Sequence, residues 1–131
     1  MTRTQRIVLG WLPAVLWCAL IFGLSAQPSL PSPNHINDKE AHAFTYGVLA
    51  LLLLMGLTRW QWRRVAAVSI VAAFGIAVLY GISDEFHQSF VPGRTPDVVD
   101  VAADAAGAGL ALAAAWGWAI LLTRRSSTSR S

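Results

Sequence analysis

Two kinds of residue are scarce in this sequence, and each shortage excludes a class of protein. Cysteine occurs once, at Cys18, so the chain cannot form an internal disulfide, a CxxC redox pair or a cysteine-based zinc site. Charged residues make up only 13% of the chain, while 55% is hydrophobic. Soluble domains carry about 25% charged residues, so this composition indicates a protein surrounded mainly by lipid. The basic residues form short clusters between apolar runs, which offer no surface for nucleic acid.

Uninterrupted apolar segments, by contrast, are long and frequent. A helix rises about 1.5 Å per residue, so about 20 apolar residues are needed to cross about 30 Å of hydrocarbon. Four segments approach or meet this length: residues 7–24, 41–57, 65–82 and 101–122. We therefore predict an all-α integral membrane protein, in which a single domain over residues 1–131 forms a four-helix bundle. A short polar extracytoplasmic loop, residues 83–96, would join the third and fourth helices.

Charged residues separate to opposite ends of these segments. Eight of the ten basic residues flank one set of helix ends: Arg3, Arg6, Arg59, Arg63, Arg64, Arg124, Arg125 and Arg130. Because cytoplasmic loops of membrane proteins are enriched in Lys and Arg, both termini are predicted to be cytoplasmic. All seven carboxylates lie at the opposite, extracytoplasmic ends, where Lys39 and Arg94 are the only basic residues. Two cations against seven carboxylates give that face a formal charge of −5.

The first segment has a second interpretation as a signal peptide. Two arginines, an apolar stretch and the sequence Gly23-Leu24-Ser25 resemble such a peptide and its cleavage site. The apolar core of a signal peptide has about 7 to 15 residues, and residues 7–24 are longer, so a permanent transmembrane helix is the preferred prediction. Cleavage would leave the orientation unchanged, and the intact mass of the purified protein distinguishes the two.

Small residues recur every four positions in the fourth segment, in two rows. The first row is Ala103, Gly107, Ala111 and Ala115, and the second is Ala105, Gly109, Ala113 and Gly117. Apolar side chains gain little by leaving lipid, so rows of small residues mark places where helix backbones approach closely. The fourth helix is therefore predicted to be the central, enclosed helix of the bundle.

Polar residues spaced by three or four positions mark the extracytoplasmic ends of three helices. They are Asp38, His42 and Tyr46 in the second helix, Tyr80, Asp84, His87 and Gln88, beside Glu85, in the third, and Asp97, Asp100 and Asp104 in the fourth. Residues at this spacing share one face of a helix. Each helix thus presents a polar stripe at the same depth, and we expect the three stripes to converge.

Two acidic residues near these stripes are explained by helix starts. Glu40, three residues after Asn37, resembles the second member of a capping box. Asp97 follows Thr95-Pro96, where Thr serves as the cap, Pro takes the first helical position and Asp meets the positive end of the helix dipole. We therefore assign structural rather than catalytic roles to Glu40 and Asp97.

Other members of the stripes have no such explanation. Asp84 and Glu85 lie at a helix C-terminus, where the helix dipole disfavours anions. Asp104 lies inside the fourth span, where a charge costs about 2.5 kcal/mol or more near the bilayer centre and less toward the interface. Asp100 and His42 are equally hard to explain by packing. Ionisable groups kept at such positions indicate a functional site.

The clustered groups suggest acid and base chemistry. Carboxylates held together away from water repel one another, so at least one is expected to be protonated near neutral pH and able to exchange a proton. The candidate acid and base residues are Asp84, Glu85, His42 and Asp100, and the candidate binding residues are Lys39, Arg94, Asp38, Tyr46, Gln88 and Asp104. Carboxylates and an imidazole could also hold a divalent cation, but no compact HxxxH or ExxH pattern is present. A metal is therefore the weaker prediction, and no cofactor is assigned.

These residues form three ordered motifs with a known counterpart. The motifs are Asp38-Lys39-x-x-His42-x-x-x-Tyr46-x-x-Leu49, then Asp84-Glu85-x-x-Gln88-x-Phe90-x-Pro92-x-Arg94, then Asp100-x-x-x-Asp104-x-x-Gly107. Over residues 24–122 the chain resembles the VanZ-like family of bacterial membrane proteins. That family commonly has Asn at the position of Asp104, so whether this residue acts as an acid or as a hydrogen-bond partner stays open. The resemblance implies a multi-pass protein of the bacterial plasma (inner) membrane, and an effect on susceptibility to glycopeptide antibiotics such as teicoplanin.

The leading functional hypothesis is a site that binds or processes a membrane lipid head group or a lipid-linked envelope precursor. Lys39 and Arg94 would hold its anionic part, and the candidate acid and base residues would supply hydrogen bonds or proton transfer. One alternative is a proton-coupled transporter or flippase, which would need a homo-oligomer to form a pathway. Another is a non-catalytic scaffold that binds a partner membrane protein. The sequence does not decide whether the protein is an enzyme.

Overall fold

The computed structural model describes residues 2–28 and 38–128, and these residues form four long helices. α1 spans Arg3–Ser25, α2 spans Asp38–Thr58, α3 spans Ala67–Gln88 and α4 spans Val98–Thr128, while a short 3-10 turn, η1, covers Trp62–Arg64. The described residues contain no strand, and each of the four helices is long and apolar enough to cross a membrane. The predicted all-α chain with four candidate spans is confirmed. The predicted helix cap at Asn37 lies outside the described residues.

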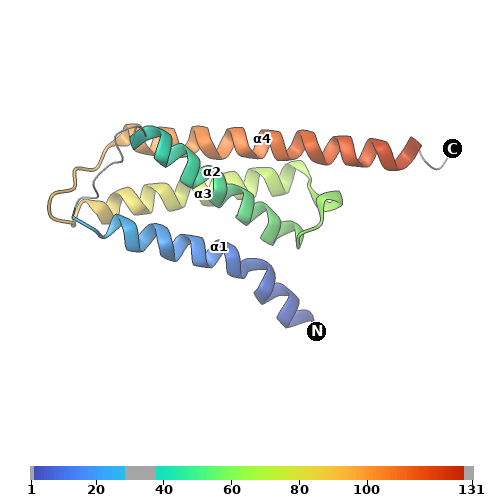
Figure 1. The fold of residues 1–131 in the computed structure, drawn as a ribbon, viewed down its shortest axis with the longest axis horizontal. Coiled ribbons are helices and arrows are strands. Elements are labelled where there is room, and N and C mark those ends of the chain that lie inside the picture. Colours follow the sequence, from blue (N-terminus) through green and yellow to red (C-terminus); the bar gives the residue numbers. More distant parts are fainter. Residues whose placement is uncertain (1, 29–37, 129–131) are drawn as a thin grey trace.

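The helices run alternately up and down the bundle (Figure 1). The start of α1, the turn between α2 and α3, and the end of α4 therefore lie at one end. The end of α1, the start of α2, the end of α3 and the start of α4 lie at the other end. Both termini would thus be on one side of a membrane that all four helices cross. That this side is cytoplasmic stays a prediction from the charge pattern.

α3 is longer than predicted and carries its polar residues in helical conformation. It continues through Gln88, beyond the apolar segment 65–82, so residues 83–88 belong to the helix, as the helical spacing of Asp84, His87 and Gln88 indicated. The backbone N–H of Ser89 still donates to Glu85 O at 3.2 Å, and the side chains of Asp84 and Gln88, one turn apart, are hydrogen-bonded. The loop boundary predicted at residue 83 was wrong, because it followed the apolar run, which ends before the helix does.

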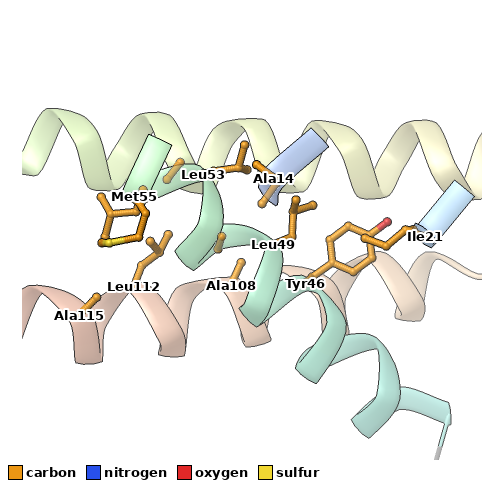
Figure 2. Packing of buried hydrophobic residues seen from close by; sticks show 13 residues of the cluster. Ala14, Ile21, Tyr46, Leu49, Leu53, Met55, Ala108, Leu112 and Ala115 are labelled. Atoms are coloured by element: carbon orange, nitrogen blue, oxygen red, sulfur yellow. The ribbon is translucent and has the colours of Figure 1, made fainter. Parts of the chain in front are cut away.

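α2, rather than α4, is the central helix. Within the 18-residue apolar stretch of each helix, half of the residues are buried in α2, compared with 28% in α4, 22% in α3 and 17% in α1. Figure 2 shows the core cluster, in which Leu49 of α2 belongs to the same group as Ala14 of α1 and Leu112 of α4. The prediction that α4 is enclosed was wrong, because small residues allow a close approach on one face without covering the others. Leu110, for example, is 74% exposed on α4.

The first row of small residues on α4 is the place where α2 and α4 touch. A Cβ placed at Gly107 would lie 1.9 Å from Ala43 O, and one placed at Gly47 would lie 3.2 Å from Gly107 O. The predicted close approach is therefore confirmed for this row. In the second row, Ala113 and Gly117 are exposed, and no described atom lies within 4 Å of a Cβ placed at Gly117. The contact along the first row brings the acidic starts of α2 and α4 together.

Candidate functional site

The polar stripes of α2, α3 and α4 meet at the end of the bundle opposite the termini. Five of their polar residues are buried, with between 1% and 7% of their surface exposed: Asp84, Glu85, Gln88, Asp100 and Asp104. Tyr46 of α2 is buried as well, and His42 is partly buried. The bundle thus holds four carboxylates away from solvent at this end, and their partners decide what the site can do.

Lys39 links α2 to the start of α4. Its ammonium group donates to Asp97 Oδ2 at 2.8 Å and also to Asp100 Oδ1. The side chain of Asp100 is only 9% exposed, whereas that of Lys39 is 36% exposed. The bond from Lys39, with a second from the backbone N–H of Val99, holds the pKa of Asp97 below its usual value. The residue predicted to hold an anionic ligand is therefore engaged by two carboxylates of its own chain.

His42 and Asp104 form the deepest polar pair. His42 Nδ1 lies 2.9 Å from Asp104 Oδ1, and the side chain of Asp104 is only 1% exposed. We assign the shared proton to Nδ1 of His42, because an ionised carboxylate accepts hydrogen bonds but does not donate them. Gly81 of α3 leaves room for this pair, since a Cβ there would lie 2.9 Å from Asp104 Oδ2. Asp104 thus serves as a hydrogen-bond acceptor, a role that asparagine could also fill.

α3 contributes three buried polar side chains. Gln88 Nε2 donates to Asp84 Oδ2 at 3.1 Å, and the backbone N–H of Asp97 donates to Glu85 Oε2 at 2.9 Å. Glu85 therefore ties the end of α3 to the start of α4. Asp84 Oδ1, Glu85 Oε1 and the Tyr46 hydroxyl are buried and have no hydrogen-bond partner among the described residues. Because an unpaired buried polar atom costs about 1 to 3 kcal/mol, these atoms are the unused hydrogen-bonding capacity of the site.

A cavity of about 360 Å³ lies between α1, α2 and α3 beside these groups, and we call it the mixed cavity. Its wall on α1 is mainly apolar and consists of Trp17, Leu20, Ile21, Leu24 and Ser25. The opposite wall is mainly polar and consists of Asp38, Ala41, His42, Thr45 and Tyr46 of α2, Asp84 and Gln88 of α3, and Arg94. Four of the predicted site residues are not part of its lining: Lys39, Glu85, Asp100 and Asp104.

Arg94 lines the mixed cavity but is bonded to the backbone at the end of α1. Its Nε donates to Gln27 O at 2.9 Å, and its Nη2 donates to Leu24 O at 3.3 Å. The last carbonyl groups of a helix have no partner within the helix, so a guanidinium group is a suitable donor for them. Arg94 therefore fastens the loop after α3 to α1. Its predicted role in holding an anion stays a prediction.

The sequence pattern did not predict that α1 contributes to the site. The indole N–H of Trp17 donates to Thr45 O at 3.0 Å and so joins α1 to α2 beside the cavity. In the sequence, Trp17 and its neighbours look like any lipid-facing residues, so no local signal could have identified them. His87, by contrast, packs on α1, where its ring stacks on Phe22 at a centroid distance of 4.4 Å and its Nδ1 lies 3.4 Å from Ser25 Oγ.

A larger cavity, of about 550 Å³, lies at the end of the bundle that carries the termini. Its charged lining consists of Arg3, Arg6, Arg59 and Arg64. None of the predicted site residues lines it, and its arginines are those that the orientation rule accounts for. We therefore place the candidate site in the mixed cavity, whose lining includes the buried carboxylate Asp84 and two of the three residues with an unpaired polar atom, Asp84 and Tyr46.

Known proteins are similar to this chain over most of its length. A family model described as VanZ/LLP1 matches residues 10–122. An uncharacterized protein of the fission yeast Schizosaccharomyces pombe is 37% identical over 91 residues, which cover 68% of this chain and 51% of the yeast protein. The match thus spans about half the length of that relative, and no solved structure matches. Because this relative is eukaryotic, a bacterial origin and an effect on antibiotic susceptibility are not confirmed.

Proposed function

Because the chain belongs to the VanZ/LLP1 family and has four helices that could cross a membrane, we propose that its mixed cavity binds the head-group region of a membrane lipid or lipid-linked precursor. The observation that carries this proposal is the combination of one apolar and one polar wall around about 360 Å³. A volume of this size suits a small ligand, or one part of a larger one. The head group would contact the polar wall, and the first methylene groups of the chains would contact α1.

The charges around the cavity favour a head group that carries hydrogen-bond donors. Lys39 donates to carboxylates and Arg94 donates to backbone carbonyls, so both cations already have acceptors within the chain and neither requires a phosphate. The unpaired Asp84 Oδ1 accepts hydrogen bonds, and the unpaired Tyr46 hydroxyl can donate or accept. An amine or hydroxyl group could satisfy both atoms. We therefore propose an amine- or hydroxyl-bearing head group in place of the anionic group expected from the sequence.

The described interior favours binding at one end over transport through the bundle. Between the polar site and the termini the core is filled by Leu49, Leu54 and Leu112, each at most 1% exposed. A proton-coupled pathway needs titratable groups or water at this level. Binding of a head group at one end is therefore the function that the geometry supports best.

Lipid retention by the purified protein tests this proposal. Ala41 lines the mixed cavity, so Ala41→Leu would fill part of it, and Asp84→Ala would remove an unpaired acceptor. Ala113→Leu is a matched control, since Ala113 is exposed on α4 and is not among the cavity residues. Native mass spectrometry would measure bound phosphatidylethanolamine. The two cavity variants are expected to retain at least about tenfold less than the wild type and the control, a loss of about 1.4 kcal/mol.

Two results would count against the proposal. Equal retention of phosphatidylethanolamine by the wild type, Ala41→Leu and Asp84→Ala, all with wild-type thermal stability, would remove the mixed cavity as a lipid site. A preference for phosphatidic acid, whose head group is a phosphate without an amine or alcohol, over phosphatidylethanolamine would reject the amine- or hydroxyl-bearing head group and favour the anionic one.

A further inference from the structure

Three side chains of the kinds that bind metals meet at the polar end of the bundle. Asp38 and His42 are one turn apart on α2 and so share a face, and Asp100 meets them from α4. One ligand atom from each residue lies within 4.8 Å of the other two. The third residue comes from a distant helix, which is why no compact metal motif is visible in the sequence.

The orientation of His42 suits a metal ligand. Asp104 accepts a hydrogen bond from Nδ1, which leaves Nε2 as the nitrogen that faces Asp100. A carboxylate on the far nitrogen is the usual way in which a metal-bound histidine is held. Nε2 lies 3.7 Å from Asp100 Oδ2, too far for a hydrogen bond but close to the separation of two ligands that each bind one cation at about 2.0 to 2.2 Å. Lys39 bonds the other oxygen of Asp100, Oδ1.

A buried group outside this trio also points to a ligand. Asp84 lines the mixed cavity together with Asp38 and His42, and it is only 6% exposed. Its Oδ1 has no hydrogen-bond partner among the described residues. A buried carboxylate oxygen without a partner is costly, and a nearby cation would relieve that cost. The formal charge of this end, with seven carboxylates against two basic residues, also favours binding of a cation.

We propose that Asp38, His42 and Asp100 form a binding site for a first-row divalent metal ion such as Zn²⁺ or Mn²⁺. One imidazole and two carboxylates suit these ions, whereas Mg²⁺ and Ca²⁺ prefer oxygen ligands alone. Three protein ligands leave at least one coordination position for water or for an occupant of the cavity. Asp104 acts as a positioning residue, because it orients the ring of His42 and does not belong to the trio.

Metal titration of the purified full chain in detergent tests the site. After treatment with a chelator, Zn²⁺ and Mn²⁺ are added separately and binding is followed by isothermal titration calorimetry, with Mg²⁺ for comparison. One Zn²⁺ or Mn²⁺ per chain is expected to bind, more tightly than Mg²⁺. Loss of a carboxylate that supports a metal-bound histidine weakens binding about 10- to 100-fold. Loss of a ligand itself, in His42→Ala or Asp100→Asn, is expected to weaken binding by more than this.

Asp104 variants separate positioning of the histidine from a general structural role. Asp104→Leu removes the acceptor for Nδ1–H and is expected to weaken metal binding about 10- to 100-fold. Asp104→Asn keeps an oxygen acceptor and is expected to bind the metal nearly as tightly as the wild type. If the Asn and Leu variants are equally stable without metal and bind it equally well, the positioning role of Asp104 is wrong.

Matched controls exclude binding by any surface carboxylate or histidine. Glu40→Gln and His87→Ala lie outside the trio and are expected to bind metal as the wild type does. Asp38→Asn changes an exposed side chain and so tests the site even if His42→Ala or Asp100→Asn fails to fold. The site is overturned if the wild type binds neither ion, or if Asp38→Asn and the other folded ligand variants bind as tightly as the wild type.

This proposal does not depend on lipid binding. A protein that binds metal through the trio but retains no lipid would support the metal site and contradict the proposed function. Retention of lipid by a chain that binds neither Zn²⁺ nor Mn²⁺ would support the proposed function and contradict the metal site. The two proposals can therefore fail separately.

Discussion

Replacement of Gly107 by alanine would insert a methyl group at the closest contact between α2 and α4. The added Cβ would lie 1.9 Å from the Ala43 carbonyl oxygen and 2.5 Å from its carbonyl carbon. Ordinary contacts begin at 3.4 Å, so the helices would have to separate by about 1.5 Å at this point. Because the opposing atoms belong to the backbone, rotation of a side chain could not relieve the overlap.

The separation would affect both stability and the site. Inserting a methyl group into a well-packed contact costs about 1 to 3 kcal/mol, and a clash with backbone belongs at the upper end of that range. The pair formed by His42 and Asp104 also bridges α2 and α4, at 2.9 Å, and Asp104 is only three residues before Gly107. We therefore expect Gly107→Ala to lower the free energy of unfolding by about 3 kcal/mol and to break this hydrogen bond.

Thermal unfolding of the purified protein in detergent measures the effect. Gly117→Ala is the matched control, because it makes the same change on the same helix where no described atom lies within 4 Å of the added carbon. There the higher helix propensity of alanine, about 1 kcal/mol, should make the change neutral or stabilising. If Gly107→Ala unfolds at the temperature of the wild type, the close packing of α2 on α4 is wrong.

Two further predictions concern the start of α4. Glu85→Ala removes the acceptor for the backbone N–H of Asp97 and is expected to lower the free energy of unfolding by about 1 to 3 kcal/mol. Glu85→Gln keeps an oxygen acceptor and should lower it less. Equal losses of stability for the two variants in denaturant unfolding would contradict this role. Lys39 holds the pKa of Asp97 below its usual 3.8, so the stabilisation by this carboxylate is present above that pH and is lost as the pH falls through the lowered pKa. The unfolding temperatures of the wild type and Asp97→Asn should therefore differ at about pH 6 and converge as the pH falls below 3.8. A difference that is constant with pH would refute the ion pair.

The contacts of the buried groups narrow the candidates for proton transfer. Glu85 accepts from the backbone of Asp97, and Asp100 accepts from Lys39, so each has a partner that explains its place. Of the four candidate acid and base residues, Asp84 and His42 are the two that line the mixed cavity. Any catalytic role, which stays a prediction, would therefore involve these two residues first.

The class of fold followed from local properties of the chain. Four apolar segments of sufficient length predicted four candidate spans, because the thickness of a bilayer sets the length of each helix. The polar stripes could also be recognised in advance, since residues three or four positions apart share a helix face whatever surrounds them. The close approach at Gly107 was predictable for the same reason: a row of small residues is itself a local pattern.

The partners of each stripe depended on how the helices rotate and cross, which a linear pattern does not encode. For this reason the central helix proved to be α2, and the apolar wall of the mixed cavity came from α1, whose residues look lipid-facing in the sequence. The pairing of His42 with Asp104, which joins residues 62 positions apart, also depends on how the helices cross. Each of these contacts exists only because packing brings two helices together, so only the tertiary structure could decide them.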